Sequence, residues 1–182
     1  MKVYENVLSE KLFAEVVKDL YSRLDKGIWS SSRFSWPEHI KKHISGSTNW
    51  TDIKKSLAQK ILTEFKEHYP YKDEGEIAVM YYIMNPNAGI SVHQDEDFYS
   101  WNATVYLNEN WDADWGGLLL WNEDDTYFKG LVPKKNRMVV FDTNVSHIVT
   151  PVAHTAPQER ATIQIRKVRK NNIMEKKNGK LS

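Results

Sequence analysis

The sequence contains no cysteine, which excludes disulfides, thiolate zinc sites and iron–sulfur clusters. It also lacks any apolar run near the roughly 18 residues of a membrane span. The early Glu5 interrupts the region where a secretory signal would be apolar. A strong charge of either sign is missing as well, because 25 basic and 24 acidic residues give a net charge of +1. We therefore expect a soluble, cytoplasmic protein without a membrane partner.

A chain of 182 residues is long enough for one domain with a proper core. Two amphipathic helices are predicted in its first seventy residues. In the first, Ser9 is the expected N-cap, and apolar residues recur at helical spacing over residues 12–24. The second is expected to begin near Thr51 or Asp52 and to end before Pro70.

After about residue 75 the sequence changes to short apolar runs separated by turns, which are typical of a sandwich or a barrel. The run I-A-V-M-Y-Y-I-M predicts a buried strand. Helices followed by strands favour an α+β, mainly β fold in which the helices back one sheet. Further strands are expected near residues 90–94, 102–107, 117–121, 127–132, 137–141, 147–152 and 161–166.

The connection between the helices, residues 27–50, is long and has little periodicity. It carries Trp29, Arg33, Phe34, Trp36 and Trp50. Long connections without clear structure are often functional, so one interpretation is a lid over a substrate, together with the loop at residues 96–101. Ordinary packing of a helix on a sheet explains the same aromatic residues equally well.

The segment S-V-H-Q-D-E-D at residues 91–97 places one histidine among three acids. Alternate residues of a strand share a face, so His93 and Asp95 can bind one ion together. Two histidines and a carboxylate form the facial triad of non-haem iron(II) oxygenases. Chance alone produces about 0.8 His-x-acid pairs in such a chain, so the pair requires a third ligand. Asp97 shares the nominal face, and we expect a bend after Asp95 to take it away.

Four other histidines and one preferred candidate compete for the third position. His147 is preferred because it lies just past an apolar strand in M-V-V-F-D-T-N-V-S-H, and His154 in V-A-H-T-A-P is the alternative. His39 and His43 have the spacing of a helical zinc site, but two lysines separate them and indicate a solvated face. The helix dipole accounts for His68.

Seven segments then occur in a familiar order: Y-Y-I-M-N-P-N-A-G, H-Q-D, V-Y-L-N, G-G-L-L-L-W, P-K-K-N-R-M-V-V-F, H-I-V-T-P-V and R-A-T-I-Q-I. Together they resemble the 2-oxoglutarate and iron(II)-dependent dioxygenases, specifically the prolyl 4-hydroxylase-like branch. The opening V-Y-E-N-V-L-S-E-K-L-F also looks like the start of such a domain. The resemblance covers most of residues 3–166 and is weakest over 27–50. It implies a double-stranded β-helix, or jelly roll, with N-terminal helices packed on one sheet.

The resemblance also assigns roles. It makes His93, Asp95 and His147 the iron ligands and the catalytic centre. Arg160 would bind the distal carboxylate of 2-oxoglutarate, and Tyr106 would donate a hydrogen bond to the same carboxylate. The implied cofactors are iron(II), 2-oxoglutarate as cosubstrate and dioxygen, with ascorbate as a further candidate. Residues 1–166 would form a single dioxygenase domain, followed by a basic, flexible tail at 167–182.

Strand alternation agrees with a polar cosubstrate pocket. Asn102, Thr104 and Tyr106 share one strand face, as do Arg160, Thr162 and Gln164, while Ala161, Ile163 and Ile165 are expected to pack under the helices. We add Thr162 and Tyr82 to the residues expected to bind the cosubstrate. Gly116 and Gly117 are expected to form a turn or bulge.

One departure from the family pattern concerns the basic residue. The gap of 13 residues from His147 to Arg160 is a few longer than this branch leads us to expect, with A-H-T-A-P-Q-E as the insertion. A surface loop tolerates that length. Lys134, Lys135 and Arg166 stay open as substitutes.

The activity implied is hydroxylation of an unactivated C–H bond, most of all in a prolyl residue of a peptide or protein, with release of succinate and carbon dioxide. A carboxylate at position 95 favours hydroxylation over halogenation. One alternative is oxidative demethylation of nucleic acid, supported by the six-residue spacing of Arg160 and Arg166 and by the basic tail. The other is a non-enzymatic jelly-roll binding module.

Overall fold

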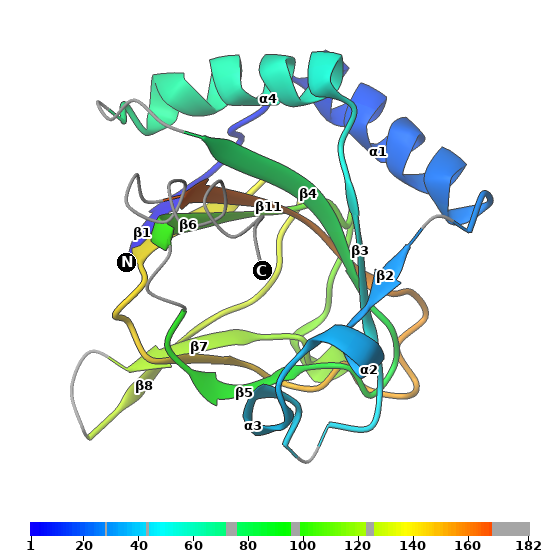
Figure 1. Cartoon of the computed structure of the whole chain (residues 1–182), viewed down its shortest axis with the longest axis vertical. Coiled ribbons are helices and arrows are strands. Elements are labelled where there is room, and N and C mark those ends of the chain that lie inside the picture. Colours follow the sequence, from blue (N-terminus) through cyan, green and yellow to red (C-terminus); the bar gives the residue numbers. More distant parts are fainter. Residues whose placement is uncertain (28, 43, 72–75, 96–98, 123–125, 169–182) are drawn as a thin grey trace, which may run out of the picture.

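The computed structural model describes residues 1–168 apart from 28, 43, 72–75, 96–98 and 123–125. In this part of the chain, eleven strands form two antiparallel sheets that face one another, and two long helices cover the outside of the larger sheet (Figure 1). This confirms the predicted jelly roll with N-terminal helices on one sheet. The strands are β1 (Lys2–Tyr4), β2 (Ser30–Ser31), β3 (Thr48–Asp52), β4 (Ile77–Met84), β5 (Ile90–His93), β6 (Tyr99–Tyr106), β7 (Leu119–Asn122), β8 (Phe128–Leu131), β9 (Met138–Asp142), β10 (His147–Val149) and β11 (Arg160–Val168). The helices are α1 (Glu10–Leu24), α2 (Ser32–Ser35), α3 (Glu38–Lys41), α4 (Lys55–His68) and the 3-10 turn η1 (Ala113–Trp115).

The larger sheet has the strand order β1-β9-β6-β11-β4-β3-β2, and the smaller sheet has the order β5-β10-β7-β8. β11 therefore lies at the centre of the larger sheet, hydrogen-bonded to β4 on one side and β6 on the other. β10 lies inside the smaller sheet, between β5 and β7. The strands that carry the candidate histidines, His93 at the end of β5 and His147 at the start of β10, are thus neighbours, although they are far apart in the sequence.

Helix α1 begins where the sequence predicts. The Ser9 hydroxyl accepts a hydrogen bond from the backbone N–H of Leu12 at 3.3 Å, which satisfies one of the free donors of the first turn. The same hydroxyl donates to Glu64 of α4 at 2.8 Å, so the cap also joins the two helices. The buried stripe of α1 consists of Leu12, Phe13, Val16 and Leu20.

The second helix begins later than predicted. Residues 48–52 form β3, which pairs with β4 and places Trp50 opposite Tyr82, and α4 starts only at Lys55. The prediction was wrong because the pairing partner of β3 lies some 30 residues away in sequence, so local periodicity gives no sign of it. The end of α4 at His68, just before Pro70, agrees with the prediction.

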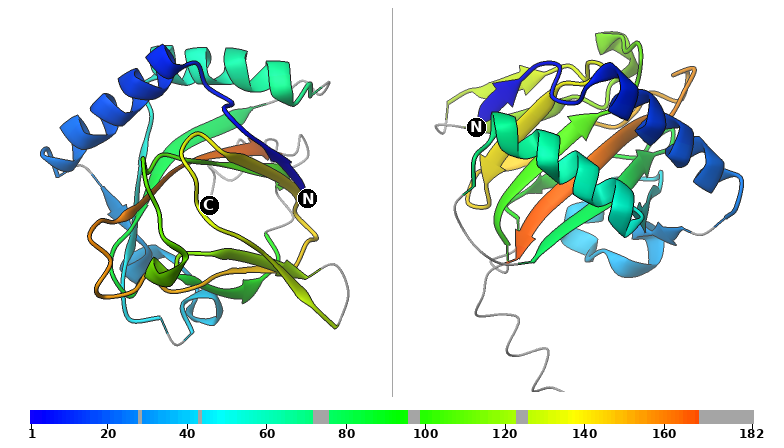
Figure 2. Two further views of the ribbon diagram at one scale, coloured as in Figure 1. Left: turned by 180° about the vertical axis from the view of Figure 1, so that it is seen from behind. Right: turned by 90° about the horizontal axis from the view of Figure 1, so that it is seen from above.

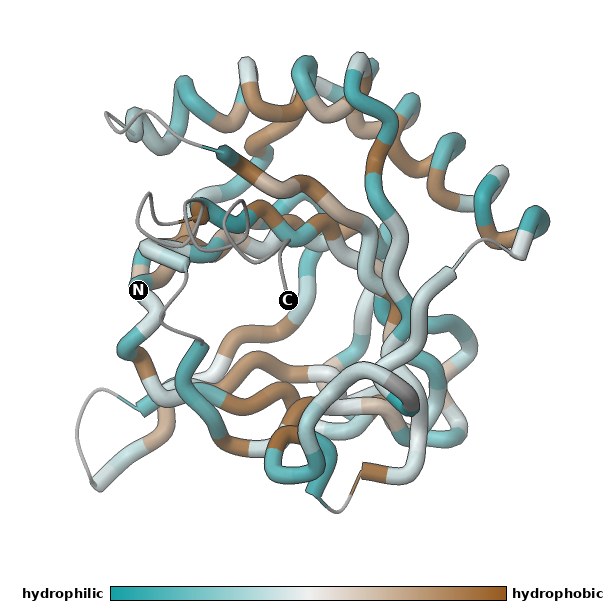
Figure 3. The backbone as a smooth tube through the Cα atoms, in the orientation of Figure 1, coloured by the Kyte–Doolittle hydropathy of each residue, from teal (hydrophilic) through white to brown (hydrophobic). Residues whose placement is uncertain are grey.

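The core forms between the helices and one face of the larger sheet. Ala161, Ile163 and Ile165 of β11 pack with the buried residues of α1 and α4, as strand alternation predicted. Figure 2 shows the two helices lying across the sheet, and Figure 3 shows their apolar residues turned toward it. The opposite face of β11 carries Arg160 and Gln164 toward the space between the sheets.

Several boundaries differ from the sequence expectations. β6 begins at Tyr99, earlier than expected. β10 ends at Val149, and beyond it Val152 forms only an isolated antiparallel bridge, with Gly116. The three-residue edge strand β1 was not predicted. β11 continues to Val168, two residues into the expected tail, and residues 169–182 lie outside the described part of the chain. No helix within the described residues has the length and apolar character needed to cross a bilayer.

Candidate metal centre and cosubstrate pocket

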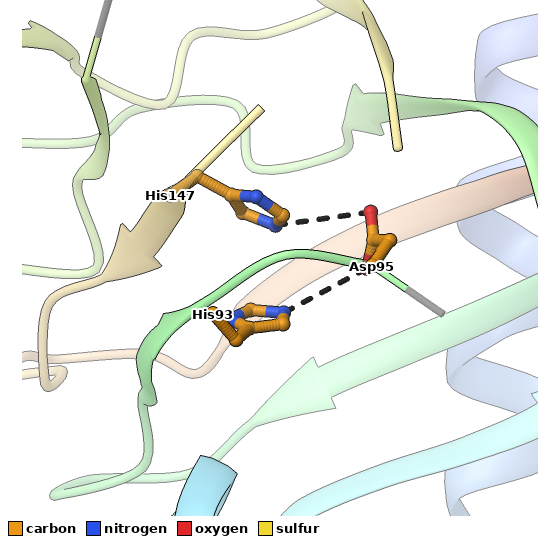
Figure 4. Close-up of side chains that lie close together, drawn as sticks. All are labelled: His93, Asp95 and His147. Carbon is orange, nitrogen blue, oxygen red and sulfur yellow. Dashed lines mark ion pairs between the residues drawn. The ribbon is translucent and has the colours of Figure 1, made fainter. Parts of the chain in front are cut away.

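Three side chains predicted as metal ligands converge between the sheets (Figure 4). His93 ends β5, His147 begins β10, and the two residues lie directly opposite one another in the antiparallel pairing. Asp95 follows two residues after His93, and its backbone N–H donates to Thr143 O at 3.1 Å, which fixes the turn out of the strand. The ligand atoms of the three residues all lie within 4.8 Å of one another. Glu96 and Asp97, whose orientation was part of the prediction, lie outside the described residues.

Backbone carbonyls orient both imidazole rings. Nδ1 of His93 lies 2.8 Å from Ser91 O, and Nδ1 of His147 lies 2.9 Å from Val145 O. A neutral imidazole that donates from Nδ1 keeps the lone pair of Nε2 for a metal. Both Nε2 atoms point at Asp95, at 3.7 Å from Oδ1 for His93 and 3.9 Å from Oδ2 for His147. Two nitrogen donors and one hard oxygen donor therefore face a common point.

The electrostatics of the site suit a metal ion. Burial lowers the pKa of His147, partly offset by the charge of Asp95, so the imidazole stays neutral and able to bind metal at neutral pH. Burial works against ionisation of Asp95, but the hydrogen bond with His93 and the electrostatic effects of His147 and of the Arg166 cation lower its pKa below the ordinary value. The donor set of two neutral nitrogens and one carboxylate fits iron(II) with coordination positions left over.

Asn102 supports the carboxylate from the neighbouring sheet. Its side-chain amide donates to Oδ2 of Asp95, and the residue is only 2 % exposed. Sequence reasoning placed Asn102 on the inward face of its strand but did not connect it to Asp95. The alternation of β6 predicts that Asn102 faces inward. Its contact with Asp95 could not be predicted, because the sequence does not show where the chain runs after β5.

Arg160 lies at the other end of the same pocket, buried to 2 % exposure. Its Nε donates to Gly117 O at 2.8 Å, and Nη1 contacts the Met84 sulfur at 3.7 Å. Neither partner carries a charge, and no carboxylate in the described ranges lies within ion-pair distance of this guanidinium. Burial lowers the pKa of Arg160, yet arginine stays protonated in proteins. A buried cation of this kind requires an anion from elsewhere.

Tyr106 is the second polar group at that end. The guanidinium carbon of Arg160 lies 5.0 Å from the centre of its ring. The Tyr106 hydroxyl is buried and has no hydrogen-bond partner among the described residues. Burial raises its pKa, with Arg160 acting in the opposite direction, so the group stays a neutral O–H donor. A distal carboxylate of 2-oxoglutarate would satisfy both the unpaired cation and the unused hydroxyl.

The remaining predicted cosubstrate residues lie between the two ends. Tyr82 lines the pocket, whereas Tyr81 points to the helices and donates to Val16 O. Thr162 is fully buried and does not reach the pocket wall; its hydroxyl accepts from the side chain of Gln164, which does line the pocket. Thr104 donates to the other end of the Gln164 amide at 3.0 Å. Thr162 thus positions a lining residue rather than forming the lining.

Two successive glycines precede β7, and the second of them makes room for Arg160. Gly116 and Gly117 have φ values of +66° and +63°, which favour glycine strongly. A Cβ atom on Gly117 would lie 2.8 Å from Cδ of Arg160. The expected turn before β7 therefore also gives the arginine its path across the pocket and its acceptor at Gly117 O.

The competing candidates from the sequence lie elsewhere. His154 is exposed on the loop before β11, and His39 is exposed on the short helix α3. His43, the other half of that zinc-like pair, is outside the described residues. Lys134 is exposed, and Lys135 pairs with carboxylates at the surface. Arg166 is different, because it lines the pocket beside Asp95.

A groove leads from the surface to the triad. Its lining includes Trp36, Pro37, His39, Trp50 and Tyr82, around a cavity of about 340 Å³. The segment 27–50, for which a lid and ordinary packing were the two interpretations, thus contributes some of its residues to this groove. Trp29 does not take part, since it packs against the core and donates to Arg23 O. The side chain of Phe34 lies outside the described part.

The sequence comparison decides the family. A model of the 2OG-Fe(II) oxygenase superfamily matches residues 63–165, which contain the triad and Arg160. The chain belongs to this superfamily. In sequence alone, no curated protein matches this oxygenase.

Solved structures of prolyl hydroxylases share the fold of this oxygenase. A Pseudomonas putida prolyl-4-hydroxylase is 18% identical, with a TM-score of 0.71 over 93% of this chain and 92% of its own. A Trichoplax adhaerens prolyl hydroxylase, solved with a peptide fragment of the hypoxia inducible factor oxygen degradation domain, is 16% identical, with a TM-score of 0.72 over 99% and 87%. A Phytophthora capsici prolyl 4-hydroxylase is 15% identical, with a TM-score of 0.65 over 93% and 58%. At these identities the likeness establishes the fold.

Proposed function

We propose that the protein is a 2-oxoglutarate-dependent iron(II) dioxygenase that hydroxylates a prolyl residue of a peptide or protein. The observation that carries this proposal is the placement of two complementary sites across one pocket. Three metal-ligating groups converge at one end, and a buried cation without a described anionic partner occupies the other. An ion and a dicarboxylate that spans the pocket satisfy both ends at once.

His93, Asp95 and His147 would hold the iron. The carbonyls of Ser91 and Val145 keep both Nε2 atoms directed at the ion, and Asn102 keeps the Asp95 carboxylate from rotating. Arg160 and Tyr106 would bind the distal carboxylate of 2-oxoglutarate. Tyr82 and Gln164 would line its middle, with Thr162 holding Gln164 in place.

When bound, iron(II), 2-oxoglutarate and dioxygen supply the C–H oxidation, with succinate and carbon dioxide as co-products. The protein orients the reactants and limits the access of water, because the pocket lies between two sheets and its walls include Leu119, Phe141 and Val149. A carboxylate at position 95 occupies a ligand position that a halogenase would leave to a halide.

The prolyl substrate is the finer part of the proposal. It is supported by the similarity of the fold to prolyl hydroxylases, one of which was solved with a peptide. It is also supported by the groove, which is open to the surface beside His93 and Asp95 and has aromatic walls suited to a saturated ring. Ascorbate is proposed as an activator that keeps the iron reduced between turnovers.

Anaerobic titration of the purified chain with iron(II) and 2-oxoglutarate tests the cofactor assignment, because the expected complex has a metal-to-ligand charge-transfer band. Succinate release and the gain of one oxygen atom by the substrate are then measured across proline-containing peptides, free amino acids and methylated oligonucleotides. Hydroxylation confined to the oligonucleotides would support nucleic-acid demethylation instead. Absence of the band with 2-oxoglutarate and with its close analogues would favour a binding module.

A further inference from the structure

Arg166 lies where the groove meets the inner pocket and lines both cavities. Its guanidinium carbon is 5.3 Å from the ring centre of Tyr82 and 5.2 Å from that of Tyr99, so two aromatic faces hold it. A guanidinium stacked on rings keeps its in-plane N–H donors for hydrogen bonds, and this planar fork matches a carboxylate. The side chain is therefore held in place and still able to bind.

The cation has hydrogen-bonding capacity that the described residues do not use. Its Nε is buried and has no hydrogen-bond partner there. Leaving a buried charged donor unmet is unfavourable, and a ligand that meets it gains the corresponding free energy. Burial lowers the pKa of Arg166, but the neighbouring Tyr82 and Asp95 raise it by more, so the guanidinium stays protonated.

The charge balance of the groove favours an anion. Among the described residues that line it, Asp95 is the only carboxylate. An ion bound by the triad would compensate that charge, which leaves Arg166 as the excess charge next to the reacting position. Electrostatic complementarity of this kind selects for an acidic ligand and against a neutral one.

The aromatic wall defines what lies beside the anion. Trp36, Trp50 and Tyr82 stack on one another, with ring centroids 5.7 Å apart for the two tryptophans and 5.8 Å for Trp50 and Tyr82. Tyr82 is the member that also contacts Arg166. An apolar ring on this wall and a carboxylate on Arg166 would thus belong to one small region of the substrate.

We propose that Arg166 is a specificity-determining residue that binds a carboxylate of the substrate, so that the preferred substrate is a prolyl compound with a carboxylate close to the reacting ring. This inference rests on the proposed function. The carboxylate has two sources, either the terminal carboxylate of a prolyl residue or the side chain of an acidic residue next to it. Both present the same two oxygens to the guanidinium.

The test measures binding to the full chain loaded anaerobically with iron(II) and 2-oxoglutarate, by calorimetry. Two matched pairs of ligands separate the sources: N-acetyl-L-proline with its amide, and a capped Pro-Asp dipeptide with capped Pro-Asn. In at least one pair the acid is expected to bind about tenfold more tightly than the neutral partner, which is the size of one charge-assisted pair. The pair that shows the difference identifies the source.

Arg166→Gln is expected to bring the ratio of acid to neutral affinity near one, with little change in the affinity for the neutral ligand and for 2-oxoglutarate. Arg166→Lys keeps the charge but not the planar fork, so an intermediate ratio is expected. Lys134→Gln is the matched control, because it removes a positive charge from an exposed residue that does not line the groove, and it should leave the ratio unchanged.

The charge-transfer band is recorded before any substrate is added, so that a failure of the proposed function can be distinguished from a failure of the role proposed for Arg166. Without the band the proposed function fails. With the band present, equal binding of acid and neutral partner in both wild-type pairs, or binding of none of the four ligands, overturns the role of Arg166. The role is also overturned if Arg166→Gln and Arg166→Lys, with far-UV spectra like wild type, weaken 2-oxoglutarate binding and leave the acid preference intact.

Discussion

His93 lies opposite His147 across the β5–β10 ladder, and the centroids of the two rings are 4.3 Å apart. The residues are far apart in sequence, so only the pairing of these short strands brings them together. A metal that binds both should therefore stabilise the smaller sheet in its paired form. We therefore expect metal binding and the folding of this sheet to be coupled.

Asp95→Ala is expected to abolish iron-dependent turnover, because it removes the only carboxylate among the three convergent groups. Anaerobic iron(II) is expected to raise the melting temperature of the wild type, and Asp95→Ala should remove this rise. Asp97→Ala is the matched control and should only weaken activity. Near-normal succinate formation by Asp95→Ala would refute the ligand assignment.

Asn102→Ala is expected to weaken iron(II) binding by about 10- to 100-fold, the usual effect of losing a residue that orients a metal ligand. The mechanism is the loss of the amide that donates to Oδ2 of Asp95. Equilibrium titration with iron(II) measures the effect. Asn110→Ala, at an exposed asparagine, serves as the control. Equal iron affinity in the two variants would show that Asp95 needs no such support.

Gly117→Ala is expected to weaken 2-oxoglutarate binding, because the new methyl group would push Cδ of Arg160 from its path. Charge-assisted bonds of this kind contribute roughly 1.5–3 kcal/mol, so a loss of about tenfold or more in affinity is expected. Gly27→Ala imposes a similar positive-φ strain, with φ of +67°, but meets no atom within 4 Å. If both variants lower the affinity equally, backbone strain and not the arginine is responsible.

Stability should fall steeply at alkaline pH. Burial raises the pKa of Tyr81, Tyr82 and Tyr106 in the folded protein, whereas an unfolded tyrosine ionises near pH 10. Above about pH 10 the unfolded chain therefore holds fewer protons than the native one, and the free energy of unfolding decreases by about 1.4 kcal/mol per pH unit for each group.

Tyr81→Phe isolates one of these groups. It removes the hydroxyl that donates to Val16 O and to Asp19, so the variant should be about 1 kcal/mol less stable at neutral pH. Above pH 10 its free energy of unfolding should decrease less steeply with pH than that of the wild type, by the contribution of one ionising group. Denaturant unfolding at several pH values measures both effects. An unchanged slope would mean that Tyr81 is ionisable in the folded state.

Strand alternation placed His93 and Asp95 on one face and separated the polar from the apolar face of β11, whereas the jelly roll and the complete ligand set were implied by the family resemblance. His93 and Asp95 are two apart, and Arg160 and Gln164 share a parity opposite to that of Ile163. Such a pattern is local and survives uncertainty in strand order. The register that sets His147 opposite His93 is not local and was not predicted; the family resemblance supplied only the choice of His147 as the third ligand.

Other features depended on contacts that no local pattern encodes. β3 has only one large apolar residue, Trp50, and is a strand because β4 offers it a hydrogen-bonded edge. Arg160 and Arg166 look equivalent along β11. They differ only in surroundings, with Gly117 and Tyr106 near the first and Tyr82 and Tyr99 near the second.

β11 also fixes the distance between the two arginines, and its alternation makes an insertion within the strand costly. It holds both arginines at a separation of six residues, about 20 Å along the strand, while Ala161, Ile163 and Ile165 anchor it under the helices. One residue inserted within β11 would turn the charges downstream of it into the apolar layer and the isoleucines into the pocket. The loop at 153–159 ahead of the strand can change length without this penalty, because an insertion there leaves the distance between the two cations unchanged.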